Sequence, residues 1–171
     1  MIPFKDAQVK SLIDREYFSF VLSQVKRARH KIWVSLFIYD IRPSRDLEGL
    51  VLDLTAALIE RNSLGVDVKV LLNGIATTPD ISVANLASGL YLTEFGIQHR
   101  RVFDNENRSG SHAKFLICDD LAVIGSQNWT DDGFRLNIED AIILKSKPVM
   151  ILEREFLRLW EVGRGLPSQN L

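Results

Sequence analysis

The sequence predicts an α/β protein built on one mixed β-sheet, with helices flanking both faces of that sheet. Two patterns carry this prediction. As far as Phe103, helical and strand-like apolar patterns alternate, as they do where helices connect parallel strands. From His112 onward, strand-like runs follow one another across short connections, which is typical of antiparallel pairing. The length of 171 residues fits a single domain that covers residues 1–171.

The alternating half is expected to contain three helices and three strands. The helices are predicted from apolar residues at helical spacing, with Asp14 and Ser44 as N-caps of the first two. The strands are predicted from nearly continuous apolar runs, which suit strands buried on both faces. In chain order, the expected elements are a helix at 14–30, a strand at 32–38, a helix from 44 to about 62, a strand at 66–72, a helix at about 80–94 and a strand at 97–103.

The second half is expected to begin with a tight hairpin. Its strands are His112–Cys118 and Leu121–Ile124, and two aspartates alone separate them. A further strand is expected at 138–144. The last element is an amphipathic helix at about 149–160.

Charge and cysteine content limit the classes of function. The chain has 21 Lys and Arg against 22 Asp and Glu, a net charge of −1, so any site for a polyanion must be a local basic patch. The single cysteine, Cys118, excludes an internal disulfide and fits a reducing compartment. Neither a signal peptide nor a membrane-spanning run is recognisable, so we expect a cytoplasmic protein without a membrane anchor.

The stretch SHAKFLICD, residues 111–119, places two ionisable side chains at the start of an apolar run. His112 and Lys114 stand two residues apart, so on a strand they share a face. Two neighbouring cations are unfavourable unless the imidazole is neutral or an anion lies between them. A phosphate would satisfy both side chains, which makes the pair a candidate phosphate site.

Neutral donors and one carboxylate follow this pair in the sequence. Ser126 and Asn128 come after the second hairpin strand, at a turn, and offer a hydroxyl and an amide. Glu139 lies near the start of the next strand and could accept the second N–H of an imidazole. The set lacks the carboxylate cluster that would hold Mg²⁺, so we expect neither a metal nor a cofactor.

These residues form three short motifs at defined spacings. They are His112-x-Lys114-x4-Asp119, Gly125-Ser126-Gln127-Asn128 and Asn137-x-Glu139. Together they resemble the motifs of the phospholipase D (HKD) superfamily, and most of all those of its short single-motif members, the Nuc-type nucleases. The resemblance implies the phospholipase D/nuclease fold and a metal-independent cleavage of phosphodiesters.

The resemblance also implies a role for each residue. His112 would attack phosphorus and form a covalent phosphohistidine, while a second histidine protonates the leaving oxygen. Lys114 and Asn128 would hold the phosphoryl oxygens, with Ser126 as a weaker candidate. Glu139 would fix the tautomer of His112.

Some charged residues have more than one interpretation. Asp119 belongs to the first motif, but its place in the hairpin turn favours structural support. His99, Arg101 and Arg108 either steer a polyanion towards His112 or form an ordinary exposed strand end and loop, and both interpretations stay open. The basic run at 26–31 ends a helix, where compensation of the helix dipole explains it.

The chain offers one such histidine for chemistry that needs two. Neither His30 nor His99 lies in a matching sequence, so we expect a two-fold homodimer in which His112 and Lys114 of each chain face their twins.

The expected function is an endonuclease acting on DNA or RNA. One alternative is a phospholipase D or phosphatidyltransferase acting on phospholipid head groups, with residues 80–95 towards the lipid. Another is a nuclease module of a larger restriction or repair protein.

Overall fold

The computed structural model describes residues 8–75, 78–104, 109–145 and 147–165. Eight strands form one sheet in the order β1-β8-β7-β6-β2-β3-β4-β5. The elements are, in chain order, β1 (Gln8–Ile13), α1 (Glu16–Arg27), β2 (Lys31–Leu36), α2 (Leu50–Ser63), β3 (Asp67–Asn73), α3 (Pro79–Glu94), β4 (Gln98–Asp104), β5 (Ser109–Gly110), β6 (Phe115–Cys118), β7 (Leu121–Gly125), α4 (Asp131–Arg135), β8 (Asp140–Lys145) and α5 (Lys147–Val162).

The sheet is parallel in one part and antiparallel in the other. Strands β2, β3 and β4 run parallel, whereas β6, β7, β8 and β1 pair antiparallel in sequence. The two parts meet where β6 pairs antiparallel with β2. This confirms the expected change from parallel to antiparallel order in the second half of the chain.

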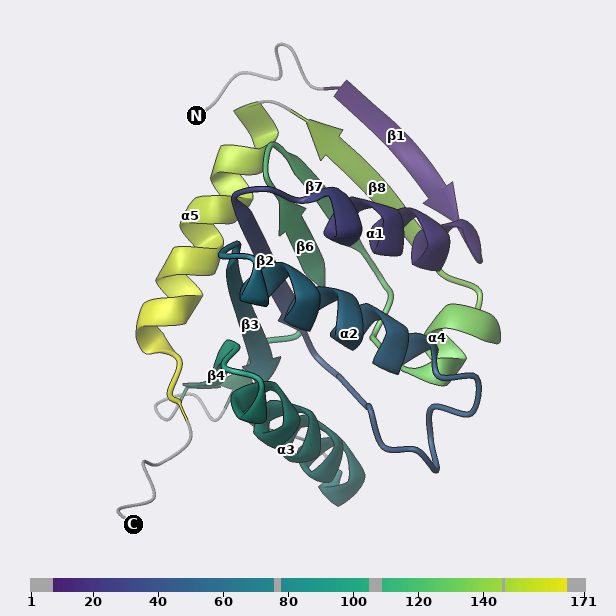
Figure 1. Ribbon diagram of the computed structural model, residues 1–171, viewed down its shortest axis with the longest axis vertical. Coiled ribbons are helices and arrows are strands. Elements are labelled where there is room, and N and C mark those ends of the chain that lie inside the picture. Colours follow the sequence, from purple (N-terminus) through teal and green to yellow (C-terminus); the bar gives the residue numbers. More distant parts are fainter. Residues whose placement is uncertain (1–7, 76–77, 105–108, 146, 166–171) are drawn as a thin grey trace.

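Helices cover both faces of the sheet, as expected (Figure 1). Helices α1 and α2 pack over one face, and α5 packs over the other. Along β2 the side chains alternate between these layers: Ile32 and Val34 lie in the α1–α2 core, and Trp33 stacks on Phe156 of α5 with ring centroids 5.1 Å apart. Complete burial of Ile32 or Val34 contributes about 1.5–3 kcal/mol each, so the central strands hold the three layers together.

Both predicted N-caps are wrong. Helix α1 begins two residues after Asp14, which takes a left-handed backbone conformation with φ 50°. Helix α2 begins at Leu50, six residues after Ser44. The carboxylate of Asp46 accepts two backbone N–H groups in the first turn of α2, at 3.1 and 2.9 Å. Asp46 therefore caps the helix, the role that the pattern assigns to Ser44.

The strands also differ from the prediction at two places. The sequence does not predict β1, because Leu12 is the one buried side chain of this edge strand and the apolar pattern is weak. Strand β6 begins at Phe115, so His112 and Lys114 precede it in irregular backbone. The two-residue strand β5 and the short helix α4 are also absent from the predicted elements.

The hairpin of β6 and β7 is confirmed, and Asp119 ties its turn to the rest of the sheet. Asp119 has φ 52°, and its carboxylate accepts the backbone N–H groups of residues 29–31 at 2.9, 2.9 and 3.0 Å. Burial pushes the pKa of this carboxyl up, but the three donors outweigh it and hold the pKa of Asp119 below its ordinary value. Asp119 thus holds the start of β2, at the end of β6 away from His112.

Candidate active site

The imidazole of His112 and the ammonium of Lys114 lie side by side. Lys114 Nζ is 3.1 Å from His112 Nδ1 and 3.0 Å from the His112 carbonyl oxygen. Phe37 directly follows β2 and supports the pair. The Phe37 ring centroid lies 4.2 Å from the centroid of the imidazole and 5.2 Å from Lys114 Nζ. Because β6 runs antiparallel to β2, the residues before β6 meet the residues after β2 at this edge of the sheet.

The surroundings of the pair favour a neutral imidazole. Partial burial, and then the positive charge of Lys114, lower the pKa of His112 below its ordinary value. Burial also lowers the pKa of Lys114, and the charge of Glu139 opposes this in part. A neutral imidazole at neutral pH has the free lone pair that a nucleophile needs.

Lys114 fixes the tautomer of His112 in this structure. An ammonium group only donates hydrogen bonds, so Nδ1 accepts and the ring proton of the neutral imidazole lies on Nε2. Attack through Nε2 needs the other tautomer, with the proton on Nδ1. Lys114 must therefore move from Nδ1 to another acceptor, such as a phosphate oxygen, before Nε2 is nucleophilic.

Glu139 is buried and bonds to neighbours other than His112. One carboxylate oxygen accepts from Ser126 Oγ, and the other accepts from Asn137 Nδ2 at 3.1 Å. The Asp14 backbone N–H donates to the Glu139 carbonyl at 2.8 Å, which anchors the segment. No hydrogen bond between the described residues joins Glu139 to His112, so the role of Glu139 in setting the tautomer stays a prediction. The hydroxyl of Ser126 is likewise directed to this carboxylate.

Asn128 lies on the segment next to Phe37. Its Oδ1 accepts the backbone N–H of Ile38 at 3.2 Å, and the main chains of 38–40 and 129 exchange two further hydrogen bonds of 3.1 and 2.9 Å. The orientation of the amide is thereby fixed, with its NH₂ group left as the donor. Asn128 and the cation pair are thus held by one stretch of backbone.

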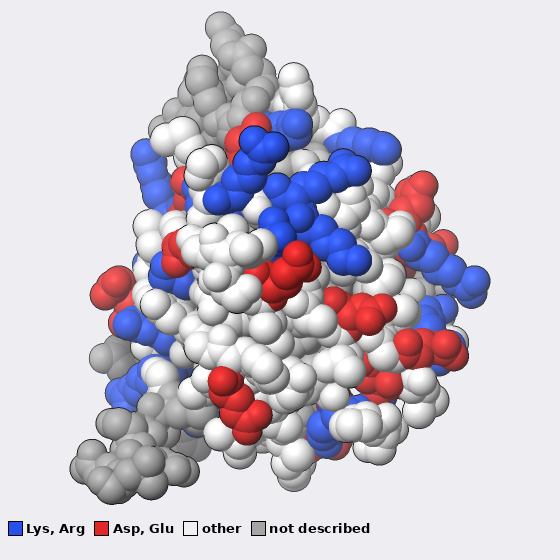
Figure 2. Space-filling view, viewed as in Figure 1, with Lys and Arg blue, Asp and Glu red and all other residues white. Residues whose placement is uncertain are grey.

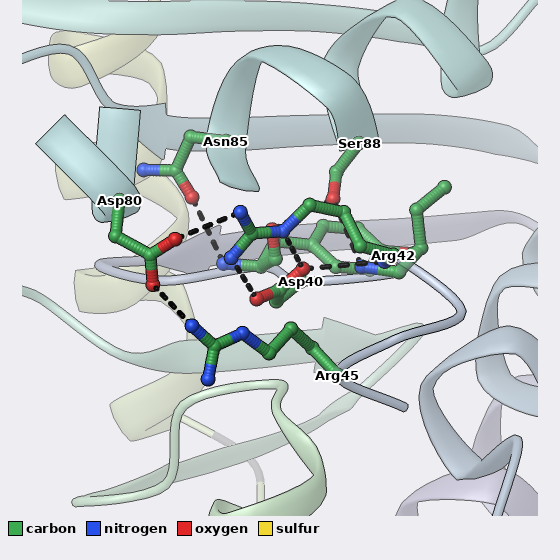
Figure 3. A network of polar contacts seen from close by, with 8 residues as sticks. Asp40, Arg42, Arg45, Asp80, Asn85 and Ser88 are labelled. Carbon is green, nitrogen blue, oxygen red and sulfur yellow. Dashed lines mark hydrogen bonds and ion pairs between the residues drawn. The ribbon is translucent and has the colours of Figure 1, made fainter. Parts of the chain in front are cut away.

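Two side chains of α3 hold that stretch in place, and the sequence does not single them out (Figure 3). Asn85 Oδ1 accepts the N–H of Tyr39 at 2.9 Å, and its Nδ2 donates to the carbonyls of Phe37 and Asn73 at 2.9 and 3.0 Å. Ser88 Oγ donates to the Tyr39 carbonyl at 2.7 Å. Asn85 thereby clamps the ends of β2 and β3 together. Polar residues on the buried side of a helix are the signal that could have identified them.

An ion-pair network borders Asn128 on a neighbouring surface. Arg42 makes a bidentate pair with Asp40 at 2.7 and 2.6 Å, and its remaining nitrogen bonds Asp80 at 2.8 Å (Figure 3). Arg45 lies 3.7 Å from the same Asp80 carboxylate. A cleft of about 260 Å³ extends from Asn128 over this network. The charged residues in the lining of this cleft are Arg45 and four aspartates, Asp40, Asp80, Asp131 and Asp132, so the cleft disfavours a second phosphate.

The turn before His112 requires glycine at position 110. A Cβ on Gly110 would collide with the side chain of Asn73, which is buried at the end of β3. The absence of a side chain therefore lets the segment that leads to His112 lie directly on the end of β3.

The structure describes two of the three residues for which steering of a polyanion is one of the two interpretations, His99 and Arg101. His99 is 8% exposed beneath α3, and its Nδ1 lies 3.3 Å from Thr93 Oγ1. The expectation that His99 offers a surface contact is wrong, because the helix covers it. Arg101 is half-buried, with its guanidinium 5.3 Å from the centroid of Phe103, and its role stays a prediction. Arg108 lies outside the described residues.

Comparison with known proteins places this arrangement in a family. A family model described as the cardiolipin synthase, phospholipase D-like domain matches residues 21–160. The chain belongs to the phospholipase D-like family. Cardiolipin synthase A of Pseudomonas putida (strain GB-1) is 30% identical over 126 residues, which are 72% of this chain and 23% of that protein. The chain thus spans about a quarter of the length of this curated relative.

Two solved structures share the fold over nearly all of this chain. Nuc from Salmonella typhimurium, a phospholipase D family member, has a TM-score of 0.74 at 23% identity and covers 95% of this chain and 100% of its own. NucT from Helicobacter pylori has a TM-score of 0.72 at 14% identity and covers 94% of this chain and 100% of its own. At these identities the likeness shows the phospholipase D/Nuc fold. It extends over 94–95% of this chain and the whole of each solved chain.

In this phospholipase D-like chain the motif residues separate into three groups. His112, Lys114 and Asn128 lie around the Phe37 segment, Glu139 lies with Ser126, and Asp119 lies at the far end of β6. Within the described residues, no group of three or more His, Cys, Asp or Glu is placed to hold a metal ion.

Proposed function

We propose that the chain is a metal-independent phosphodiesterase that cleaves DNA or RNA as an endonuclease. The observation that carries the proposal is the His112–Lys114 pair on Phe37, with Asn128 on the adjoining segment. A neutral imidazole and an ammonium 3.1 Å apart suit one phosphodiester: the first attacks phosphorus and the second holds a non-bridging oxygen.

The proposed reaction has two displacements at phosphorus. In the first, His112 Nε2 bonds to phosphorus and the bond to the leaving oxygen breaks, while a second imidazolium gives that oxygen its proton. In the second displacement, the second imidazole, neutral after giving up its proton, takes a proton from water. The water oxygen bonds to phosphorus, and the P–N bond to His112 breaks. Lys114 and the NH₂ group of Asn128 donate to the phosphoryl oxygens throughout. Movement of Lys114 onto the phosphate frees Nδ1 to carry the ring proton. Glu139 would then accept a hydrogen bond from that N–H.

The second imidazole is proposed to come from a second copy of the chain. The chain has three histidines. His30 lies beside Asp119 at the opposite end of β2, and His99 is buried beneath α3, so neither adjoins His112. A two-fold axis beside His112 would bring its twin to the same phosphate and complete one shared site.

Nucleic acid is proposed as the substrate because the motifs and the fold of the chain are similar to those of single-motif nucleases. The motif spacings resemble those of the single-motif nucleases, and the fold covers the entire length of Nuc and NucT. A role as the nuclease module of a larger restriction or repair protein would use the same chemistry.

A second candidate, phosphatidyl transfer at a lipid surface, is favoured by the exposed side of α3. Val83, Leu86 and Leu90 are 51%, 39% and 46% exposed, and the curated relative is a cardiolipin synthase. However, a helix that lies on an anionic membrane usually carries Lys or Arg, and the charged residues of α3 are Asp80 and Glu94. No helix among the described residues is both long and apolar enough to cross a membrane.

A cleavage panel in EDTA tests the proposal, with His30→Ala as the matched control for His112→Ala. We expect the wild-type chain and His30→Ala to cut DNA or RNA in EDTA, and His112→Ala to lose roughly a thousandfold or more of the rate. Loss of cleavage on adding EDTA, or a full rate in His112→Ala, would sink the proposal. Turnover of phosphatidylglycerol or phosphatidylcholine without cleavage of nucleic acid would favour the second candidate.

A further inference from the structure

A basic groove lies at the other end of the β6–β7 hairpin from His112. Helix α1 forms one wall, and the edge strand β1 with its neighbour β8 forms the other, around a volume of about 520 Å³. Its three charged residues are all cations: Lys10, Arg27 and Lys145. Figure 2 shows Lys and Arg side chains gathered in the upper part of the face drawn, where Figure 1 places the end of α1.

The register of the strands places two of these cations on the face that α1 covers. Lys145 pairs with Gln8 of β1 on one side and with Leu121 of β7 on the other, and Lys10 pairs with Ile143. Directly paired residues share a face of the sheet. Leu121 and Ile143 belong to the core beneath α1, so Lys10 and Lys145 rise from that same face at its uncovered margin.

Helix α1 presents the third cation from across the groove. Phe20, Gln24 and Arg27 are spaced i, i+4 and i+7, so they form one stripe along the helix. Phe20 packs against the core, Gln24 is half-buried, and Arg27 is exposed. The groove therefore has an aromatic floor and a polar rim.

The charge of the groove is not balanced locally. Its lining contains no carboxylate, and no ion pair links Lys10, Arg27 or Lys145 to a described Asp or Glu. The whole chain has a net charge of −1, so this concentration is local. Edge lysines discourage strand pairing, and an arginine at a helix end compensates the dipole. Neither reason explains why three like charges surround one concave space, an arrangement that an anion would stabilise.

We infer that this groove is a second nucleic-acid contact, which binds the phosphate backbone of a single-stranded segment outside the active site. The choice of nucleic acid rests on the proposed function. Lys10 and Lys145 are diagonal neighbours on paired strands, about 7–8 Å apart, so they suit successive phosphates better than one phosphate. Strand β7 separates Leu121 of the groove from Ser126 by about 17 Å, so a segment of a few nucleotides can reach both.

Binding of a labelled single-stranded oligothymidylate of about 20 nucleotides tests the inference. The measurement uses His112→Ala as the background, so that binding is read without cleavage. Lys10→Glu, Arg27→Glu and Lys145→Glu are compared singly and together with Arg154→Glu, which reverses an exposed charge on α5 away from the groove. We expect the triple variant to raise Kd at least tenfold and to reduce the slope of log Kd against log salt by about 2, as for three lost phosphate contacts. Thermal unfolding checks each variant, and Lys→Gln and Arg→Gln versions replace any that is unstable.

The outcomes separate the groove from the active site. Turnover of a small chromogenic diester, bis(p-nitrophenyl) phosphate, is expected to be unchanged in the groove variants of the otherwise wild-type chain. If the groove variants bind the oligonucleotide as well as Arg154→Glu does, the inference is overturned. It is also overturned if they lose binding to phosphatidylglycerol vesicles while oligonucleotide binding is unchanged. A wild-type chain that binds the oligonucleotide through the groove but cleaves neither substrate contradicts the proposed function and leaves the groove standing.

Discussion

At the scale of single residues, the reactivity of His112 depends on its immediate neighbours. Phe37 removes part of its water, and Lys114 places a positive charge 3.1 Å from Nδ1. Both effects favour the neutral ring, so the neutral form proposed as the nucleophile is present at lower pH than for a free histidine. In the proposed reaction the same ammonium leaves Nδ1 for the phosphate, which would couple substrate binding to the tautomer that can attack.

The titration of His112 tests this coupling. Below the pKa of His112 the ring is protonated and cannot attack, so the acid limb of the rate profile is expected to follow this pKa. Lys114→Met removes a neighbouring cation and therefore raises the pKa of His112, while the remaining burial still keeps it low. Proton NMR of the three histidines measures the shift, with His30 as an internal reference. A pKa of His112 that is unchanged or lower in Lys114→Met would contradict the account.

Asp119 is expected to contribute to stability rather than to chemistry. Asp119→Asn keeps one acceptor oxygen but cannot accept all three backbone N–H groups of residues 29–31, so we expect a loss of about 1–3 kcal/mol at pH 7. The folded-state pKa is lowered, so this contribution is complete above the unfolded pKa of about 3.9 and is lost as pH falls through the folded value. Urea unfolding at pH 7 and at acid pH measures it.

Asp120→Asn, in the same turn, is the control for this substitution, because Asp120 is exposed and makes no hydrogen bond to residues 29–31 in the described structure. Equal stability of the two variants at pH 7 would exclude the anchoring role. A large fall in kcat for folded Asp119→Asn would instead give Asp119 a part in the reaction.

At the scale of elements, the apolar patterns in the sequence predict the strands and helices whose positions depend on burial of apolar side chains. The buried strands β2, β3 and β7 and the helices over them follow from periodicity, because their side chains alternate between two cores. The sequence could not predict β1, because an edge strand with one buried side chain has little apolar pattern. The sequence also could not predict where α2 starts, because the capping carboxylate of Asp46 comes before Gly49, whose φ is 71°.

The candidate site was predictable where its residues are close in sequence. His112 and Lys114 are two residues apart, and their contact requires only a local backbone path. Asn85 and Phe37 reach the site through folding contacts between segments far apart in the chain, which no local spacing records. The mistaken exposure of His99 has the same cause, because the helix that covers it could not be placed from the sequence.

Gly110→Ala tests how closely the segment before His112 depends on β3. The added methyl group would meet Asn73, so we expect the segment to shift and kcat/KM to fall roughly tenfold or more. Global stability is expected to change by about 1–3 kcal/mol, as for other overpacked sites. Gly165→Ala is the control, since a Cβ there meets no atom within 4 Å. Full activity in Gly110→Ala would show that this approach does not position His112.

At the scale of the whole molecule, the proposed reaction needs two chains for one site. His30 and His99 lie away from His112, so the second imidazole of the proposed reaction is expected from another copy. Co-refolding of wild type with a varying share of His112→Ala tests this. If each site needs two His112 side chains, activity at constant total protein falls as the square of the wild-type fraction. A linear fall would show that one chain carries a complete site.

The covalent intermediate is the most direct test of the central claim, that His112 is a nucleophile working without a metal. The reaction on nucleic acid is quenched with alkali during turnover in EDTA, and the peptide that contains residues 111–119 is analysed by mass spectrometry. We predict an adduct on His112 in which phosphorus is bonded to the imidazole and still carries the nucleic-acid fragment on one side of the cut. It appears during turnover, decays when substrate is exhausted and is absent from Lys114→Met and His112→Ala. Undiminished turnover with no adduct on His112 at any time would contradict the account.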